Sequence, residues 1–469
     1  MKTKPELRWA DGEIERYCVV CGRRGLQNQI ALVEVNNQPP MRIARCRNCS
    51  SVLLDDPDPP VENIDYWNDY VEWIAGIEAI ASFLTLVESA PGSRFLDVGC
   101  GFGFGLDLAQ KTKGWEVLGV DPSIGARIGA QDLGVEIRIG QLGNNLVLDS
   151  TFDVILASEV LEHVLSPSDF LASVRSLLAH DGILVITTPN AKTVDPANLD
   201  VDVTMALAAG DHKFLVDAEQ LEILLRKAGF EFIEIDTTGI GLIATATLTA
   251  VGQQKSLLGL GFKNIQVDEY LRDRGNSAPK GSGLAVGMWA RLVQSEVSAG
   301  KIDEARQDMV RLADALENRY QIDLTRLDTI REMEDPPSVL VSVCYLAGFI
   351  CFVHEKNLPR AAEYFNLSLN IEIVNETKNN KAGIHPSKLF VIQSLGHLAL
   401  ALAPTKPKGA KRALKRLDRL VAAKECPAEV AKDFRDRALA ITPPHGPTYT
   451  RLRSGMRKIY IKSKHKKSK

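Results

Sequence analysis

The chain has 469 residues, more than one compact domain usually holds, and an ordinary globular composition of 45% hydrophobic and 25% charged residues. Its net charge of −3 conceals an uneven distribution. Residues 451–469 carry nine Lys or Arg and no acid, so residues 1–450 hold 47 basic and 59 acidic side chains, a net charge of −12. An acidic body with a basic tail argues against a broad polyanion-binding surface on the main fold.

The first residues, MKTKPELRWADGE, contain no apolar segment of the signal-peptide type, which predicts a cytoplasmic protein. A strongly apolar, uncharged run at residues 338–353 has 16 residues, whereas a membrane-spanning helix needs ~20. We therefore expect a buried helix there, with a membrane span as the alternative. Four of the eight cysteines stand singly, as is usual in a reducing compartment.

Two cysteine pairs, Cys18-x-x-Cys21 and Cys46-x-x-Cys49, lie 24 residues apart. Each pair can form a tight turn that points two thiolates at one centre, and two such turns supply the four-sulfur shell that zinc prefers. So short a segment buries little apolar area and would depend on the metal for stability. We predict a structural zinc ribbon over residues 1–55. A redox-active C-x-x-C is the weaker alternative, because two spaced copies occur without a thioredoxin-like pattern.

Arginines surround these pairs and could contact phosphates. Only Tyr17 offers a nearby stacking face, so the pattern argues against nucleic-acid binding. The arginines are Arg16, Arg23, Arg24, Arg42, Arg45 and Arg47.

A linker and a cap helix are predicted over residues 56–93. DDPDPP at 55–60 interrupts regular structure, and residues 70–89 show apolar positions at helical spacing. A helix just before the first strand of a larger domain could close over a ligand. Three aromatic residues are candidates to flank that ligand, and core packing is the alternative for them. They are Tyr66, Trp67 and Tyr70.

The most specific pattern is FLDVGCGFGFG, in which a buried strand ends at Asp97 and glycines follow at Gly99, Gly101 and Gly103. Without side chains, the backbone can turn sharply and let a ligand lie against its amides. Asp121 follows 18 residues after Gly103, at the end of the next strand. A carboxylate at that place can accept hydrogen bonds from both hydroxyls of a ribose.

This segment resembles class I S-adenosylmethionine (SAM) dependent methyltransferases. A nicotinamide dehydrogenase would carry G-x-G-x-x-G, and Phe104 occupies the place of its last glycine. The resemblance implies that Asp97, the three glycines and Asp121 bind SAM. A tight turn that binds nothing is the alternative.

Strands and helices alternate beyond Asp121, which predicts a doubly wound, mostly parallel α/β sheet with ligands at the carboxyl ends of its strands. The family resemblance implies a Rossmann-like domain of seven strands, the last antiparallel, over residues 94–296. We place that last strand at 283–293, with a helix as the alternative. The other predicted elements are helices 123–133, 168–180 and 217–228, and strands 135–140, 152–158, 182–188 and 230–236.

Gln141 follows the third strand of the predicted sheet, where the family usually has an acidic turn over the adenine. A glutamine can still hydrogen-bond the adenine amine, so Gln141 is included among the cofactor-binding residues that the resemblance implies.

Glu159, Glu162 and His163 have the spacing i, i+3 and i+4, which would place them on one face of a helical turn. The E-x-x-E-H pattern resembles ubiquinone-pathway O-methyltransferases, where it is associated with a divalent metal such as Mg²⁺, Mn²⁺ or Zn²⁺. Glu159 also counts among the predicted cofactor-binding residues. Alternatively, His163 is a general base held by a glutamate, or the turn only caps a helix. The N-P-P-Y sequence of enzymes that methylate nucleic-acid bases is absent.

TTPN at 187–190 and GDHKFLVDAEQLEILLRKAGF at 210–230 resemble methyltransferases of bacterial surface-polysaccharide and sugar-nucleotide pathways, a resemblance that covers residues 16–236. It makes His212 a second candidate base and implies methylation of a sugar hydroxyl or carbon. The alternatives are an RNA or protein methyltransferase that holds its substrate with the ribbon and helices, and a non-catalytic SAM-binding scaffold.

Residues 297–440 are predicted to be helical. Segments 299–317 and 345–369 resemble tetratricopeptide hairpins, but their small residues do not recur at the regular period of 34. Such hairpins bind protein partners or pack on their own catalytic domain. The basic tail, residues 441–469, is predicted to be disordered and could hold the enzyme at an anionic membrane surface on the cytoplasmic side.

Overall fold

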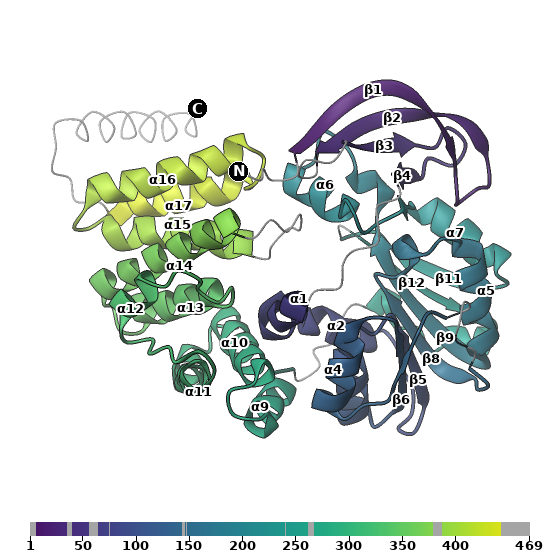
Figure 1. Cartoon of the computed structure of the whole chain (residues 1–469), viewed down its shortest axis with the longest axis horizontal. Helices are drawn as coiled ribbons and strands as arrows, with labels where there is room; N and C mark the ends of the chain where they lie inside the picture. The colour runs from purple at the N-terminus through teal and green to yellow at the C-terminus, as the bar shows by residue number, and fades with distance from the viewer. Residues whose placement is uncertain are drawn as a thin grey trace, which may run out of the picture.

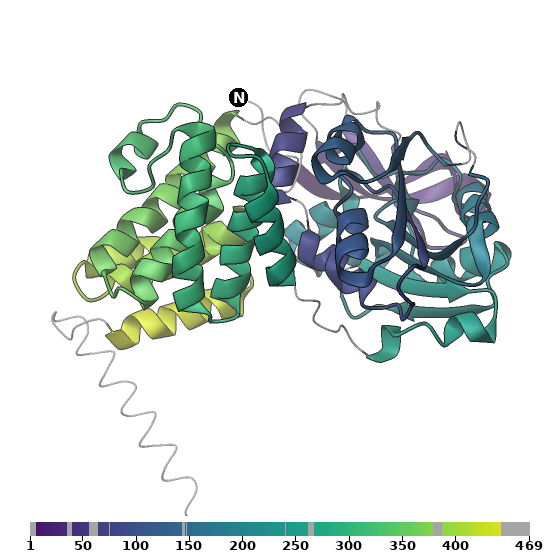
Figure 2. The same cartoon turned by 90° about the horizontal axis from the view of Figure 1, so that it is seen from below.

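The computed structural model describes residues 6–34, 40–55, 64–74, 76–142, 146, 148–239, 241–260, 267–378 and 387–441. Two halves lie side by side. One contains the sheets and the other only helices (Figures 1 and 2). Helix α1 lies between the halves in both views. The basic tail, from residue 442 onward, is outside the described residues, so its predicted role stays a prediction.

The N-terminal segment forms an antiparallel sheet in which each strand pairs with the next. A fifth strand, β10 (Phe214–Leu215), comes from a later part of the chain and pairs with β4, so that Phe214 lies opposite Leu53. The ribbon is thereby joined to the loop that carries His212. The four N-terminal strands are β1 (Glu6–Tyr17), β2 (Arg24–Glu34), β3 (Met41–Arg45) and β4 (Val52–Leu54).

The single helix predicted over 70–89 is wrong, because the segment is broken into three pieces. Helix α1 (Ile64–Asp69) continues into a π-helical turn, η1 (Tyr70–Ile74). Helix α2 (Ile77–Leu84) then begins after Gly76, and an isolated bridge pairs Val87 with Ser256.

The central sheet has seven strands in the order β11-β12-β9-β8-β5-β6-β7, as the resemblance implied. Strands β7, β6, β5, β8 and β9 are parallel neighbours, whereas β12 is antiparallel to both β9 and β11. The strands are β5 (Arg94–Val98), β6 (Glu116–Asp121), β7 (Ile137–Ile139), β8 (Phe152–Ser158), β9 (Leu178–Pro189), β11 (Phe232–Asp236) and β12 (Gly241–Thr247).

The last strand is therefore β12, and the strand predicted at 283–293 is wrong. Residues Gly283–Ser298 form helix α10, which is buried along most of its length. An apolar run reads the same in a buried helix as in a buried strand, so the pattern could not separate them.

Helices cover both faces of the sheet (Figure 1). Two of these helices begin with a side-chain cap. Ser166 accepts a hydrogen bond from the amide of Asp169 ahead of α5, and Asp217 does the same for Gln220 ahead of α7. The helices and short turns are α3 (Phe104–Leu108), η2 (Ala109–Lys113), α4 (Ile124–Leu133), η3 (Leu161–His163), α5 (Pro167–Leu177), η4 (Ala191–Thr193), α6 (Asp200–Leu207), α7 (Ala218–Lys227), α8 (Ala250–Gln253) and η5 (Leu258–Leu260).

The second half of the molecule consists of successive helices. The uncharged run at 338–353 contains α13, whose side chains are mostly buried, so the prediction of a buried helix is confirmed. Within the described ranges, no helix combines the length and apolarity needed to cross a membrane. The resemblance to tetratricopeptide hairpins stays a prediction. The helices are α9 (Val267–Ser277), α10, α11 (Ile302–Tyr320), α12 (Leu327–Arg331), α13 (Leu340–Val353), α14 (Leu358–Lys378), α15 (Ser387–Leu402), α16 (Pro407–Ala422) and α17 (Ala428–Ile441).

Candidate functional site

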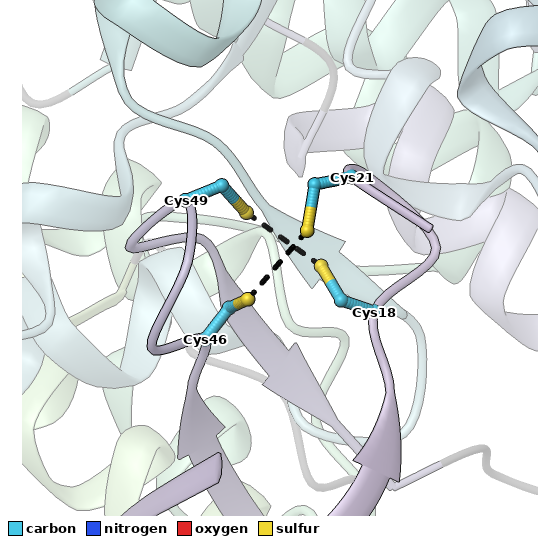
Figure 3. Close-up of side chains that lie close together, drawn as sticks. All are labelled: Cys18, Cys21, Cys46 and Cys49. Carbon is cyan, nitrogen blue, oxygen red and sulfur yellow. Dashed lines mark hydrogen bonds between the residues drawn. The ribbon is translucent and has the colours of Figure 1, made fainter. Parts of the chain in front are cut away.

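Four thiols converge at the end of the N-terminal sheet, and they point toward one another (Figure 3). The Sγ atoms of Cys18 and Cys49 are 3.6 Å apart, and those of Cys21 and Cys46 are 3.8 Å apart. A tetrahedron with Zn–S bonds of about 2.3 Å has edges of about 3.8 Å. The spacing therefore fits the four-sulfur zinc shell that the sequence predicted.

The two cysteine turns have the same backbone hydrogen bond. The amide of Gly22 donates to the carbonyl of Cys18 (2.8 Å), and the amide of Ser50 donates to that of Cys46 (2.9 Å). Gly22 and Ser50 both have positive φ, at 76° and 60°. Each turn is therefore formed by its own local sequence, and the sheet brings the two turns together.

The glycine-rich turn between β5 and α3 has the left-handed backbone that its sequence predicts. Gly99, Gly101 and Gly103 have φ values of 73°, 53° and 92°. A Cβ at Gly103 would lie 3.1 Å from Ile137 Cδ1, and a Cβ at Gly99 would collide with Val160. The turn therefore needs glycine for its conformation and for its close packing.

Asp121 ends β6 beside this turn. Its two carboxylate oxygens accept hydrogen bonds from the amides of Gly101 (2.9 Å) and Ser123 (2.8 Å). Each carboxylate oxygen has a second lone pair, so the group can still accept hydrogen bonds from two ligand hydroxyls.

Asp97 is 5% exposed at the end of β5. Burial, and secondarily the negative charge of Asp121, raises the pKa of Asp97 to about 8. Two acids at this place favour a cationic ligand, because a positive charge would stabilise both carboxylates.

An aromatic cap, which we define as Tyr66, Trp67 and Tyr70, covers the turn. A Cβ at Gly101 would lie 3.7 Å from Trp67 Cη2 and 3.7 Å from Tyr70 Oη. A side chain at Gly125, at the start of α4, would collide with the Trp67 indole. The cap therefore rests on the glycine-rich turn as one wall of the predicted cofactor site.

Gln141 lies exposed after β7. Its predicted contact with adenine stays a prediction.

The sequence pattern placed Glu159, Glu162 and His163 on one helical face, and that shared face is wrong, although the carboxyl groups of Glu159 and Glu162 still interact with each other. Glu159 directly follows β8 with φ of 54°, and only Leu161–His163 form a short 3₁₀ turn. The Glu159 carboxylate instead accepts a hydrogen bond from Thr187 (2.9 Å) on the neighbouring strand β9. A non-glycine residue in left-handed backbone is strained, and such strain clusters at functional sites.

A different trio converges beside it, which we call the acceptor cluster: Glu162, His163 and His212. Glu162 is fully buried, and its Oε1 lies 3.8 Å from His212 Nε2 and 4.0 Å from His163 Nε2. The two imidazoles pack edge to face with ring centres 4.8 Å apart. The fold thus brings together the two histidines that the sequence offered as alternative bases.

The protonation of the cluster follows from its partners. His163 Nδ1 lies 3.1 Å from the carbonyl of Asp211, and His212 Nδ1 lies 2.8 Å from that of Ala206. A carbonyl only accepts, so both Nδ1 atoms carry hydrogen and both Nε2 atoms turn lone pairs toward Glu162. Burial lowers the pKa of His212 to about 4, with a further contribution from His163. Burial, together with the charge of Glu159, holds the pKa of Glu162 well above its usual range.

One acceptor in this cluster has no partner. Glu162 Oε2 accepts a hydrogen bond from Thr188 (3.0 Å), but Oε1 has none among the residues that the structure describes. The distances from Oε1 to the two Nε2 atoms are too long for hydrogen bonds. A small group placed between the three side chains would satisfy all of them, as a divalent cation or an acceptor hydroxyl would.

Sequence reasoning did not assign roles to Thr187 and Thr188, which orient the two glutamates. The TTPN sequence at the end of β9 could have indicated this role, because β9 is the neighbour of β8 in the sheet. Adjacent strand ends place their polar side chains at one edge, so this pair could have been found from the predicted strand order.

Known proteins match the part of the chain that carries this site. A family model described as a methyltransferase domain matches residues 70–235. A ubiquinone biosynthesis O-methyltransferase of Ruegeria pomeroyi is 34% identical over 154 residues, which are 30% of this chain and 62% of that protein. A solved structure of phosphoethanolamine N-methyltransferase 2 from Haemonchus contortus with SAM is 20% identical, with a TM-score of 0.32. The matched region covers 37% of this chain and 42% of the Haemonchus chain.

The matched region is shorter than most of these relatives. The chain spans about three fifths of the length of several ubiquinone biosynthesis O-methyltransferases. Another of these enzymes, from Cereibacter sphaeroides, is 32% identical over 172 residues, which are 34% of this chain and 69% of that protein. Together with the seven-stranded sheet, this shows that the chain belongs to the class I SAM-dependent methyltransferases.

Proposed function

We propose that the protein transfers a methyl group from SAM to a hydroxyl group of its acceptor. The observation that carries this proposal is the placement of the acceptor cluster at the same sheet edge as the glycine-rich turn. Strands β5, β8 and β9 are parallel neighbours, so the turn after Val98, Glu159 after Ser158 and the loop after Pro189 share one edge. Ligands of such sheets bind at that edge.

The cofactor would be held by the turn and its two acids. SAM supplies a methyl group made electrophilic by a sulfonium, so the enzyme mainly has to align the acceptor and remove one proton. Asp121 would accept hydrogen bonds from the ribose hydroxyls, and Asp97 would face the positive charge of the cofactor. Gly99, Gly101 and Gly103 add no side chains of their own to that surface, and Trp67 and Tyr70 of the aromatic cap lie over Gly101.

The proton would pass to the acceptor cluster. His212 is neutral near pH 7, because burial lowers its pKa to about 4, and its Nε2 lone pair faces Glu162. A hydroxyl placed between Glu162 Oε1 and His212 Nε2 could give its proton to the imidazole. His163, whose side chain is 41% exposed, forms the open side of the cluster.

The same three side chains also fit a divalent cation. Two imidazole lone pairs and a buried carboxylate oxygen that has no hydrogen-bond partner among the described residues are a common ligand set. Both Nδ1–H groups are fixed by backbone carbonyls, as those of metal-bound histidines usually are. A cation here would supply a Lewis acid that lowers the pKa of the acceptor hydroxyl. The ligands would be Glu162, His163 and His212, with Glu159 outside the set.

The four thiols are proposed to hold a structural zinc. They form a closed shell of four ligands at one end of the N-terminal sheet, and zinc there would stabilise the strand pairing that reaches β10. Zinc in such a shell supplies folding stability and no open coordination position.

For the acceptor, we propose a sugar hydroxyl of a surface glycan or its nucleotide-linked precursor, as the sequence resemblance implies. Methylation at carbon is the second option. The names of the relatives, ubiquinone biosynthesis O-methyltransferases, favour an acceptor from ubiquinone biosynthesis as the rival. Partners for the helical half, and an anionic membrane for the tail, stay predictions.

Calorimetry tests the cofactor step. We expect micromolar SAM binding that disappears in Gly101→Val, because the turn cannot accept a branched side chain at φ of 53°. The matched control is Gly134→Val, a change at another left-handed glycine (φ of 71°) with no heavy atom within 4 Å of its Cβ position. Absence of binding to the wild-type chain would overturn the methyltransferase proposal.

An acceptor panel tests the second step. Methyl transfer from labelled SAM would be compared between sugar nucleotides and catechol-type phenols. Turnover on the sugars supports the glycan proposal. Turnover confined to phenols would reject the sugar acceptor and leave the hydroxyl-methylating class in place.

A further inference from the structure

The aromatic cap is fixed by the helical half of the molecule. Arg291 of α10, itself only 4% exposed, donates from Nη1 to the carbonyl of Val71 (2.7 Å) and from Nη2 to that of Tyr70 (3.2 Å). It also lies 3.3 Å from the carbonyl of Glu72. One buried guanidinium thus binds three successive carbonyls of η1. The carbonyls of a helix's last turn have no partner within the helix, and Arg291 supplies a donor to them.

A second contact binds the same segment from α11. The Glu72 carboxylate is 2% exposed and accepts hydrogen bonds from Arg319 Nε (2.5 Å) and from Tyr320 Oη (2.6 and 2.8 Å). Charge-assisted bonds of this kind are stronger than neutral ones, and a buried carboxylate without them would be costly.

The surface of α10 is shaped for this contact. Gly283 and Gly287 lie one helical turn apart and face η1. A Cβ at Gly283 would lie 3.1 Å from Glu72 Oε1, and a Cβ at Gly287 would collide with the carbonyl oxygen of Val71. The two glycines let the backbone of η1 approach the helix closely.

The cap reaches both parts of the candidate site. Trp67 and Tyr70 lie over Gly101, and Tyr70 stacks on Phe104 of α3 with ring centres 6.4 Å apart. Burial, and secondarily the negative charge of Asp211, raises the pKa of Tyr66, and the carbonyl of Asp211 is the partner of His163 Nδ1. Moving η1 would therefore move Tyr70 at the cofactor turn.

From these contacts we propose that Arg291, Glu72, Arg319 and Tyr320 form a clamp through which the helical half positions the aromatic cap over bound cofactor. The inference rests on the proposed function, since it assigns the clamp a role in SAM binding. The clamp residues touch neither cofactor nor acceptor and act through Trp67 and Tyr70. The helical half is then a part of the cofactor site, and anything that shifts α10 or α11 changes SAM affinity.

Two variants test the clamp. Tyr320→Phe removes one donor to Glu72 and keeps the ring. Gly287→Ala adds a methyl group that pushes on Val71 while favouring the helix itself. The matched control is Tyr364→Phe, which removes the buried hydrogen bond from Tyr364 to the carbonyl of Leu324 (2.9 Å) inside the helical half. If only helical stability matters, the control behaves like Tyr320→Phe.

Hydrogen exchange of residues 64–74 without SAM is the first measurement. We expect both clamp variants to exchange about tenfold faster than wild type, and Tyr364→Phe to match wild type in this segment. SAM affinity and dissociation rate are the second measurement. We expect the Kd to rise about tenfold in the clamp variants, mainly through faster dissociation.

The outcomes separate the two proposals. Absence of SAM binding to wild type overturns the proposed function and this inference with it. Wild-type binding with an unchanged or tighter Kd in both clamp variants overturns the inference alone. Equal weakening in Tyr364→Phe also overturns it, since the effect would then be general destabilisation.

Discussion

The four-thiol cluster and the acceptor cluster both gather potential metal ligands, but they differ in completeness. The thiols supply four equivalent ligands on two turns of identical backbone design, and three of the four cysteines are buried. The acceptor cluster supplies three unlike ligands, leaves Glu162 Oε1 without a partner among the described residues, and is open at His163. A structural metal site is closed, whereas a site for chemistry keeps one position open.

The difference also concerns what each cluster is attached to. The cysteine turns are formed locally and then paired by strands. The acceptor cluster is assembled from η3 and the loop before β10, and each of its members is oriented by a hydrogen bond from outside the trio. Loss of a thiol should therefore affect folding, and loss of an acceptor-cluster residue should affect turnover.

The largest effect is expected from Cys46→Ser. Loss of one thiolate leaves an incomplete shell, and structural zinc contributes about 10–16 kcal/mol in small zinc domains. Zinc content should fall from one per chain toward none, and residues 6–54 should lose protection from hydrogen exchange. Cys426→Ser, at a buried cysteine outside the cluster, is the control and should keep its zinc. Full zinc content in Cys46→Ser would refute the closed site.

Glu162→Gln is expected to lower turnover by about 10²–10⁴-fold with SAM affinity unchanged, because it removes the carboxylate that faces both imidazoles. The matched change is Glu159→Gln, which alters a neighbouring carboxylate outside the trio and should cost less than Glu162→Gln. Rates are measured with saturating SAM. Equal losses in the two variants would show that Glu159 contributes to turnover as much as Glu162 does and belongs with the acceptor cluster.

Chelation separates the two clusters directly. Dialysis against EDTA should leave the four-thiol zinc in place, because its shell is complete and mostly buried. If a cation acts at the acceptor cluster, turnover should fall about a hundredfold and return on adding a divalent metal. Undiminished turnover with retained zinc would assign proton removal to His212 without a metal.

The smallest effect concerns Asp97, a buried acid on the cofactor side. Its pKa of about 8 means that the free protein holds this carboxyl protonated at pH 7. A cationic cofactor favours the carboxylate, so binding releases a proton below pH 8 and tightens as pH rises. The Kd for SAM should rise by up to about tenfold for each pH unit below 8.

The control for this pH dependence is Asp97→Asn, which reports any titration of SAM itself. Calorimetry at about pH 6.5 and about pH 8.5 gives the two Kd values for each protein. Parallel pH profiles for the wild type and Asp97→Asn would show that Asp97 does not face the cofactor's charge.

Much of the fold followed from local pattern. Residues 124–133, 167–177 and 218–227 form helices close to where apolar spacing predicted them, and the strands around Asp97 and Asp121 do the same. Strand β12 was missed because its sequence, GLIATAT, consists of small and mixed-polarity residues without a clear alternation. It becomes a strand by pairing antiparallel with β9 and β11, and the local sequence does not indicate that pairing.

The sequence alone determined those features whose partners lie within a few residues of one another. Each C-x-x-C pair makes its own turn, and the three glycines adopt left-handed backbone for lack of a Cβ. Only the tertiary structure decided which side chains meet across the fold. The i, i+3, i+4 rule for Glu159 assumed a helix, but β8 ends at the residue before it. The third member of the cluster is instead His212, which lies 50 residues after Glu162 in the sequence. Arg291 reaches η1 across more than 200 residues, and such contacts depend on packing that spacing cannot encode.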